Sequence, residues 1–144
     1  MKTILVFIFL YVSSFSSFAQ NNPDDILGKW VTTTGSCIVE VYKQNMNYKA
    51  KVLWFKEGKK YMNDYYDEKN PNPALRNRKL LGMEVMNGLH YNAEEKEWVD
   101  GHIYDATSGK EWDSVVWLTD DHLLKVKGYW VFKFLSQTKT FKRV

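Results

Sequence analysis

The chain after residue 28 consists mainly of short segments in which apolar and polar side chains alternate. Between residues 37 and 43, for example, Cys37, Val39 and Val41 fall on one face of an extended backbone. Alternation with a period of two is typical of a β-strand that packs one face on a core. By this criterion the predicted strands are residues 29–34, 37–43, 48–55, 80–86, 98–105, 110–118, 122–128, 129–134 and 140–144.

Short turn-forming sequences separate most of these strands, and almost no segment has the periodicity of an α-helix. Gly35-Ser36 and Asp120-Asp121 are two examples of such turns. About eight or nine short strands favour a single antiparallel up-and-down barrel over a sandwich, because closing the sheet removes both exposed edges. We therefore expect an all-β chain with one domain and no internal repeats.

Residues 56–79 interrupt the pattern with a long irregular segment rich in Tyr, Asn, Asp and Pro. A loop of this length inside a compact domain is uncommon and is often functional. Within it, Asn72 has the character of a helix N-cap and Pro73 that of a first helical residue. We therefore predict a single helical turn that starts at Pro73.

Residues 1–19 have the organisation of a secretory signal peptide. Lys2 supplies a positive start, residues 4–12 are an unbroken apolar run, and Ser17 and Ala19 fit the small-residue rule for cleavage before Gln20. The apolar run is too short to span a bilayer, which needs about 20 residues. We expect residues 20–144 to be exported to the periplasm or the extracellular space, with no membrane span. The alternative is a buried N-terminal helix.

Charge and cysteine content exclude several classes of protein. The formal net charge is +3 at pH 7 and the basic residues are scattered, so we expect no nucleic-acid partner. Cys37 is the single cysteine, which excludes a disulfide within the chain. Its place in a strand pattern predicts a buried, inert thiol. An intermolecular disulfide and a reactive thiol are the alternatives. The three histidines lack metal-ligand spacing, and we expect a monomer without metal or other cofactors.

The two ends of the predicted barrel carry a long-range pair of complementary side chains. Trp30 lies on the first strand, after Gly28, and Arg143 lies on the last. If the last strand returns beside the first, the Arg143 guanidinium can cover the Trp30 indole in a cation–π contact. We expect both residues to be structural and to close one end of the core.

Several motifs, taken in order, resemble a known family. They are Gly28-x-Trp30, Asp67-x-x-Asn70-Pro71, Arg76-x-Arg78-x-Leu80-x-Gly82, Trp98-x-x-Gly101-x-Ile103-Tyr104-Asp105, Ser108-Gly109-Lys110, Leu124-x-Val126-x-Gly128-Tyr129 and Lys142-Arg143-Val144. The family is a group of small exported bacterial proteins called domain of unknown function 2147, and the resemblance covers nearly all of residues 20–144. It implies a lipocalin-like (calycin) barrel but no reaction. Trp112 and Phe141 depart from it, because the family often has Tyr and Trp there.

Candidate ligand-binding residues come from the tryptophans and from the long loop. Trp54 and Trp112 lie on predicted strands, where tryptophans could fill a solid core or line a cavity that holds one small ligand. In the loop, Arg78 could pair with Asp67 and pin the loop as a lid across the barrel mouth. Alternatively, Arg78 could face inward and bind an anionic head group. The predicted ligand-binding residues are therefore Trp54, Asp67, Arg78, Tyr104 and Trp112.

Catalytic chemistry has one candidate set on a single strand face. Asp100, His102 and Tyr104 alternate there, but neighbouring positions on that face are roughly 7 Å apart, too far for direct hydrogen bonds. No Gly-x-Ser-x-Gly motif is present. We therefore expect no catalytic residues and predict non-enzymatic binding of a small hydrophobic or amphipathic ligand. The alternatives are an envelope interaction or stress-related scaffold protein and, second, a hydrolase.

Overall fold

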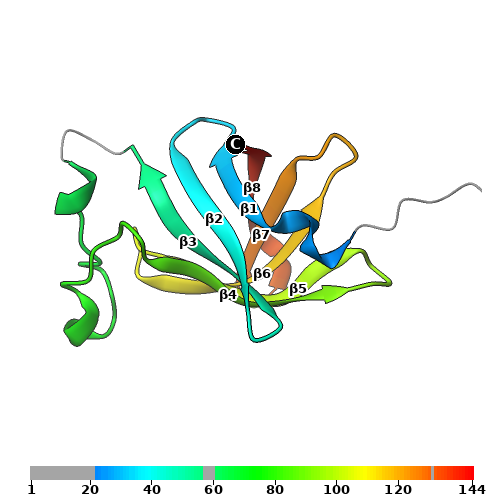
Figure 1. The fold of residues 1–144 in the computed structure, drawn as a ribbon. Helices are drawn as coiled ribbons and strands as arrows, with labels where there is room; N and C mark the ends of the chain where they lie inside the picture. Colours follow the sequence, from blue (N-terminus) through cyan, green and yellow to red (C-terminus); the bar gives the residue numbers. More distant parts are fainter. Residues whose placement is uncertain (1–21, 57–60, 131) are drawn as a thin grey trace, which may run out of the picture.

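The computed structural model describes residues 22–56, 61–130 and 132–144, which form a closed barrel of antiparallel strands (Figure 1). Each strand pairs with the next in sequence, and the last strand returns to the first. The predicted all-β up-and-down barrel is therefore confirmed. The proposed signal peptide, residues 1–19, lies outside the described residues. The strands are β1 Gly28–Thr32, β2 Cys37–Gln44, β3 Asn47–Phe55, β4 Glu84–Asn92, β5 Glu97–Asp105, β6 Lys110–Leu118, β7 Leu124–Trp130 and β8 Phe132–Arg143.

Three short 3₁₀ helices accompany the barrel: η1 (Pro23–Ile26), η2 (Met62–Asp64) and η3 (Pro73–Leu75). The predicted helical turn is η3, and its N-cap is as expected, because the Asn72 side chain accepts a hydrogen bond of 3.0 Å from the Ala74 amide. Across the described residues, none of the helices has the length and apolar character needed to cross a membrane.

Two stretches of predicted strand differ from the structure. The segment 80–86 is not a strand throughout, because β4 begins only at Glu84. Within β4, Gly88 takes a positive φ of 76° and the pairing with β3 is irregular, so Met86 and Leu89 are both buried although they are three residues apart. Near the C-terminus, three strands were expected, at residues 122–128, 129–134 and 140–144. The structure has two, β7 and the long β8, which runs from Phe132 to Arg143.

One end of the barrel is closed by η1, which lies beside the β4–β5 and β6–β7 turns (Figure 1). Ile26 and Trp30 are fully buried in the core. The Trp30 indole donates a hydrogen bond of 2.8 Å to the Ile26 carbonyl, and the Trp98 indole donates one of 3.0 Å to the Pro23 carbonyl. These bonds fix η1 over the core. Cys37, at the start of β2, is half-buried against the same core, and burial raises the pKa of its thiol, which disfavours the reactive thiolate.

Arg143 completes this closed end. It pairs with Trp30 across β1 and β8, and its guanidinium carbon lies 4.2 Å from the centre of the Trp30 ring. The same guanidinium donates hydrogen bonds to the carbonyls of Leu27 (2.7 Å) and Asp25 (2.5 Å). The predicted contact between the chain ends is therefore confirmed, and Arg143 also binds carbonyl groups at the end of η1.

Replacing Arg143 with alanine should lower the free energy of unfolding by about 1–2 kcal/mol. The loss combines the cation–π contact with two charged hydrogen bonds to carbonyl groups. Urea unfolding monitored by circular dichroism would measure it. Lys142→Ala is the matched control, because Lys142 is exposed on the opposite face of the same strand. Equal stability of the Arg143 variant and the wild type would show that the contact contributes nothing.

Candidate functional site

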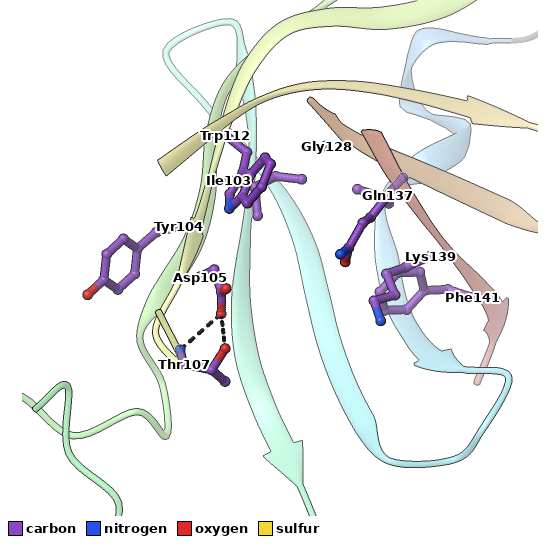
Figure 2. Close-up of a pocket in the computed structure, with 10 residues that line it drawn as sticks. Ile103, Tyr104, Asp105, Thr107, Trp112, Gly128, Gln137, Lys139 and Phe141 are labelled. Atoms are coloured by element: carbon purple, nitrogen blue, oxygen red, sulfur yellow. Dashed lines mark hydrogen bonds between the residues drawn. The ribbon is translucent and has the colours of Figure 1, made fainter. Parts of the chain in front are cut away.

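A pocket of about 450 Å³ opens at the end of the barrel away from η1 (Figure 2). It extends from the β5–β6 turn along the inner faces of β7 and β8 and is mostly apolar. The volume is within the range of small-molecule sites, which is about 300–1,000 Å³. Its described lining residues are Ile103, Tyr104, Asp105, Thr107, Trp112, Val126, Gly128, Gln137, Lys139 and Phe141.

Three small residues lie side by side on neighbouring strands, and one of them, Gly128, leaves space open at the pocket. Gly101 of β5, Ser114 of β6 and Gly128 of β7 are directly paired across the sheet. The space beside Gly101 is occupied by Leu89, since an added Cβ would lie 2.5 Å from a Leu89 methyl carbon. At Gly128 the nearest atom to an added Cβ is the Trp112 Cβ at 3.5 Å, an ordinary contact. A side chain at position 128 would therefore fit the backbone and extend into the pocket.

The inner face of β8 supplies the polar part of the lining. Gln137, Lys139 and Phe141 pair with the inward-facing residues of β7, so all three face the barrel interior. Figure 2 shows them across from Ile103 and Trp112, which come from β5 and β6. Among the described residues, neither the Lys139 ammonium nor the Gln137 amide has a hydrogen-bond or ion-pair partner. Both groups are therefore available to a ligand.

Asp105 is the carboxylate at the rim of the pocket, and its oxygens are occupied by its own turn. One oxygen accepts hydrogen bonds from the Thr107 amide (2.9 Å) and hydroxyl (2.6 Å), and the other accepts one from the Ser108 hydroxyl (2.6 Å). Burial acts to raise the pKa of Asp105, but these hydrogen bonds outweigh it and lower the pKa. Asp105 is thus ionised, with its charge compensated locally.

A buried carboxylate beside the pocket fixes the long loop to the barrel. Asp67 is 0% exposed. One of its oxygens accepts hydrogen bonds from Arg78 and Asn70, both 2.7 Å long, and the other accepts one of 2.5 Å from the Tyr104 hydroxyl. Burial acts to raise the pKa of Asp67, but these partners together lower it. Burial and the neighbouring Asp67 raise the pKa of Tyr104 to about 12. The Arg78–Asp67 ion pair expected from the sequence is therefore present.

The loop borders the pocket at the β5–β6 turn. The Lys69 carbonyl packs so closely on Gly109 that a Cβ there would lie 2.0 Å from the carbonyl oxygen, and Gly109 has a positive φ of 70°. No described residue of the loop lines the pocket. The described part of the loop therefore does not form a lid across the mouth of the pocket. The ion pair between Arg78 and Asp67 nevertheless pins the loop, as predicted.

Two of the five predicted ligand-binding residues lie at the pocket. Trp112 contributes its indole to the lining, and Tyr104 borders the pocket with its ring pointing away (Figure 2). Asp67 and Arg78 lie outside it. The guanidinium of Arg78 is bound to Asp67, so the alternative in which Arg78 faces the pocket interior is wrong. Trp54 also lies outside the pocket.

The position of Trp54 has a local cause. A bulge shifts the β2–β3 register so that Trp54 pairs with Ile38, whereas Val52 pairs with the buried Val39. Because Val39 points into the core, its neighbour Ile38 points to the outer face. Trp54 is paired with Ile38, so the Trp54 side chain also points to the outer face. Sequence reasoning also missed Gln137, Lys139 and Phe141. The available signal is that these three residues alternate with Arg143, whose contact with Trp30 fixes which face of the last strand points inward.

The candidate catalytic set is not assembled. The Asp100 carboxylate lies 3.1 Å from His90, the His102 imidazole lies 3.1 Å from Asp113, and Tyr104 bonds to Asp67. Each member therefore contacts a different neighbour, and the two histidine pairs are exposed on the outer surface. Among the residues that the structure describes, no group of three or more His, Cys, Asp or Glu side chains is placed to hold a metal ion.

Comparison with known proteins places the barrel in a family. A family model described as "Uncharacterized protein conserved in bacteria (DUF2147)" matches residues 28–143. The chain belongs to the DUF2147 family. The matched range includes all eight strands of the barrel and every described residue of the pocket lining. The expected resemblance is therefore confirmed.

A solved structure supports the fold of this DUF2147 protein independently. It carries the description "Protein HP1028 from the human pathogen Helicobacter pylori belongs to the lipocalin family". The two chains are 24% identical and superpose with a TM-score of 0.70, and the match covers 83% of this chain and 82% of the other. This likeness shows that the barrel is lipocalin-like. No curated protein matches the chain.

Proposed function

We propose that this protein is exported and binds a small, partly apolar ligand without transforming it. The observation that carries the proposal is the pocket of about 450 Å³ between the inner faces of β5 to β8. Its walls combine aromatic and aliphatic side chains with a few polar groups, which is the usual composition of a small-molecule site. Eight-stranded barrels are large enough to hold one such ligand.

The geometry favours binding over catalysis. The carboxylate of the lining, Asp105, is engaged by Thr107 and Ser108 of its own turn, and no imidazole is among the described lining residues, so Gln137 and Lys139 have no acid–base partner there. The two histidine–aspartate pairs lie on the outer surface. The interaction-protein alternative is supported by apolar side chains exposed on the loop, of which Tyr61 is 83% exposed. They do not form an enclosed site, so we favour the pocket.

A pocket-filling substitution tests the proposal. N-phenyl-1-naphthylamine, a neutral apolar dye, should bind the wild-type protein with an increase in fluorescence. Gly128→Leu should weaken this binding by at least about tenfold, equivalent to about 1.4 kcal/mol. The leucine side chain would occupy the space beside Trp112 that the glycine leaves empty. Fluorescence titration at fixed protein concentration measures both affinities.

Lys127→Leu is the matched control, because it places the same side chain one residue away on the outer face of β7. Its affinity for the dye should equal that of the wild type. Denaturation midpoints of both variants verify that they are folded. If the wild type fails to bind the dye, or if both variants bind it equally well, the pocket is not a ligand site and the interaction role becomes the better proposal.

A further inference from the structure

We infer that the pocket selects amphipathic ligands that carry an anionic group, such as a carboxylate or sulfonate, and that Lys139 binds this group with Gln137 beside it. The inference rests on the proposed function and specifies the chemistry of its ligand. It concerns a position on β8 that differs from the Arg78 site considered from the sequence.

Lys139 is an exposed lysine at the open end of the barrel. It pairs with Val126 on β7 and lies on the inner face of the barrel, and Phe141 is the next inward residue on the same strand. Its long stem can pack along apolar surface while the ammonium reaches the pocket. A positive charge with three N–H donors therefore faces a mostly apolar cavity.

Several other lysines of the described barrel have partners, whereas Lys139 lines the pocket without one. Lys43, Lys49 and Lys51 form ion pairs with carboxylates at 2.9, 3.2 and 3.0 Å. Lys125 donates a hydrogen bond of 2.8 Å to Thr140 on the outer face of the same two strands. Lys139 has no such partner among the described residues. An anionic ligand would supply the missing counter-charge at this position.

The other charged group of the lining does not reverse this preference. Asp105 could attract a cation, but three hydrogen bonds from its own turn already stabilise its charge. It lies at the β5–β6 end of the pocket, on the other side from Lys139 (Figure 2). No ion pair joins the two residues among the described contacts. The cation without a partner therefore determines which ligand charge is favoured.

The remaining lining suits the rest of such a ligand. Gln137 lies two residues before Lys139 on the same inner face, and its amide can donate hydrogen bonds to an anionic oxygen. Ile103 and Trp112 lie across the pocket and offer apolar surface. A ligand with a charged head at β8 and an apolar or aromatic body against β5 and β6 would satisfy both surfaces.

Two dyes with the same naphthalene core test the inference. 8-Anilinonaphthalene-1-sulfonate is anionic, and N-phenyl-1-naphthylamine is neutral. Lys139→Met should weaken binding of the sulfonate by about tenfold and leave affinity for the neutral dye within about twofold of the wild type. Lys139→Arg should retain most of the sulfonate affinity. Lys127→Met, on the outer face of β7, should change neither affinity.

Salt provides a second measurement that requires no variant. Sulfonate binding to the wild type should weaken between low and high ionic strength, whereas binding of the neutral dye should not, because salt screens only the charged contact. If Lys139→Met binds the sulfonate as tightly as the wild type, or loses both dyes equally, the inference is wrong. Binding of the neutral dye that Gly128→Leu blocks would leave the proposed function standing in either case.

Discussion

Replacing Trp30 with alanine should lower the free energy of unfolding by about 3–5 kcal/mol, the usual cost of removing a fully buried tryptophan. Trp30 is 0% exposed and lies at the centre of the closed end of the barrel. The substitution would leave a large cavity, remove the hydrogen bond to the Ile26 carbonyl and leave Arg143 without its aromatic partner. Urea unfolding followed by circular dichroism would report the loss as a lower midpoint.

Two further variants separate the causes of this loss. Trp30→Phe keeps an aromatic ring but removes the indole N–H, so it should cost about 1–2 kcal/mol, much of it from the unpaired Ile26 carbonyl. Trp117→Ala removes the same side chain at a half-buried position next to the buried Val116, and it should cost less than half as much as Trp30→Ala. Equal losses at Trp30 and Trp117 would contradict the assignment of Trp30 to the core.

The closed end of the barrel could be predicted from sequence because its determinants are few and strong. A tryptophan on the first strand and an arginine on the last have complementary chemistry, and the contact between them defines how the sheet closes. The alternating segments supplied the strands between these ends. The predicted residues 110–118 coincide with β6, since clear turn sequences flank this strand on both sides.

The errors arose where the two-residue period breaks. A bulge next to Val52 reverses the direction of the tryptophan that follows, and the positive φ of Gly88 brings Met86 and Leu89 to the same side. Bulges depend on how two paired strands fit together, and a single strand's pattern does not contain that information. Trp54 was placed with the ligand-binding residues for this reason.

The polar side of the pocket was missed for a different reason. Divided into several short strands, residues 122–144 lose the alternation that links Arg143 through Phe141 and Lys139 to Gln137. If β8 is read as one strand, the inward position of Arg143 places the other three inward as well. The sequence left open whether Arg78 pairs with Asp67 or binds a ligand. Only the fold shows that Asp67 is buried and that its negative charge is compensated by the Arg78 guanidinium.

Asp67→Asn should lower the free energy of unfolding by about 2–3 kcal/mol at pH 7, because it removes a buried charge with three partners. An asparagine amide can accept a hydrogen bond from Tyr104, but its NH₂ group would face the donors of Arg78 and Asn70. The loss is smaller than for a fully enclosed ion pair, since Arg78 is partly exposed and can regain water.

The pH dependence of this loss identifies its cause. The pKa of Asp67 is lowered in the folded protein from its ordinary value of 3.8, so its contribution is fully present above about pH 4. As the pH falls below that value through the folded pKa, the carboxylate is protonated and the contribution is lost. The difference in unfolding free energy between wild type and Asp67→Asn should therefore be constant near neutrality and shrink in acid.

Asp64→Asn provides the control for the same loop, because it makes the same chemical change at an exposed position. Its stability should stay within about 0.5 kcal/mol of the wild type at every pH. A second readout follows from the position of Asp67 between loop and barrel: Asp67→Asn should speed proteolysis within residues 61–79. If the loss persists unchanged in acid, the structural cause is packing and not the charge of Asp67, and the loop is held to the barrel by contacts other than this ion pair.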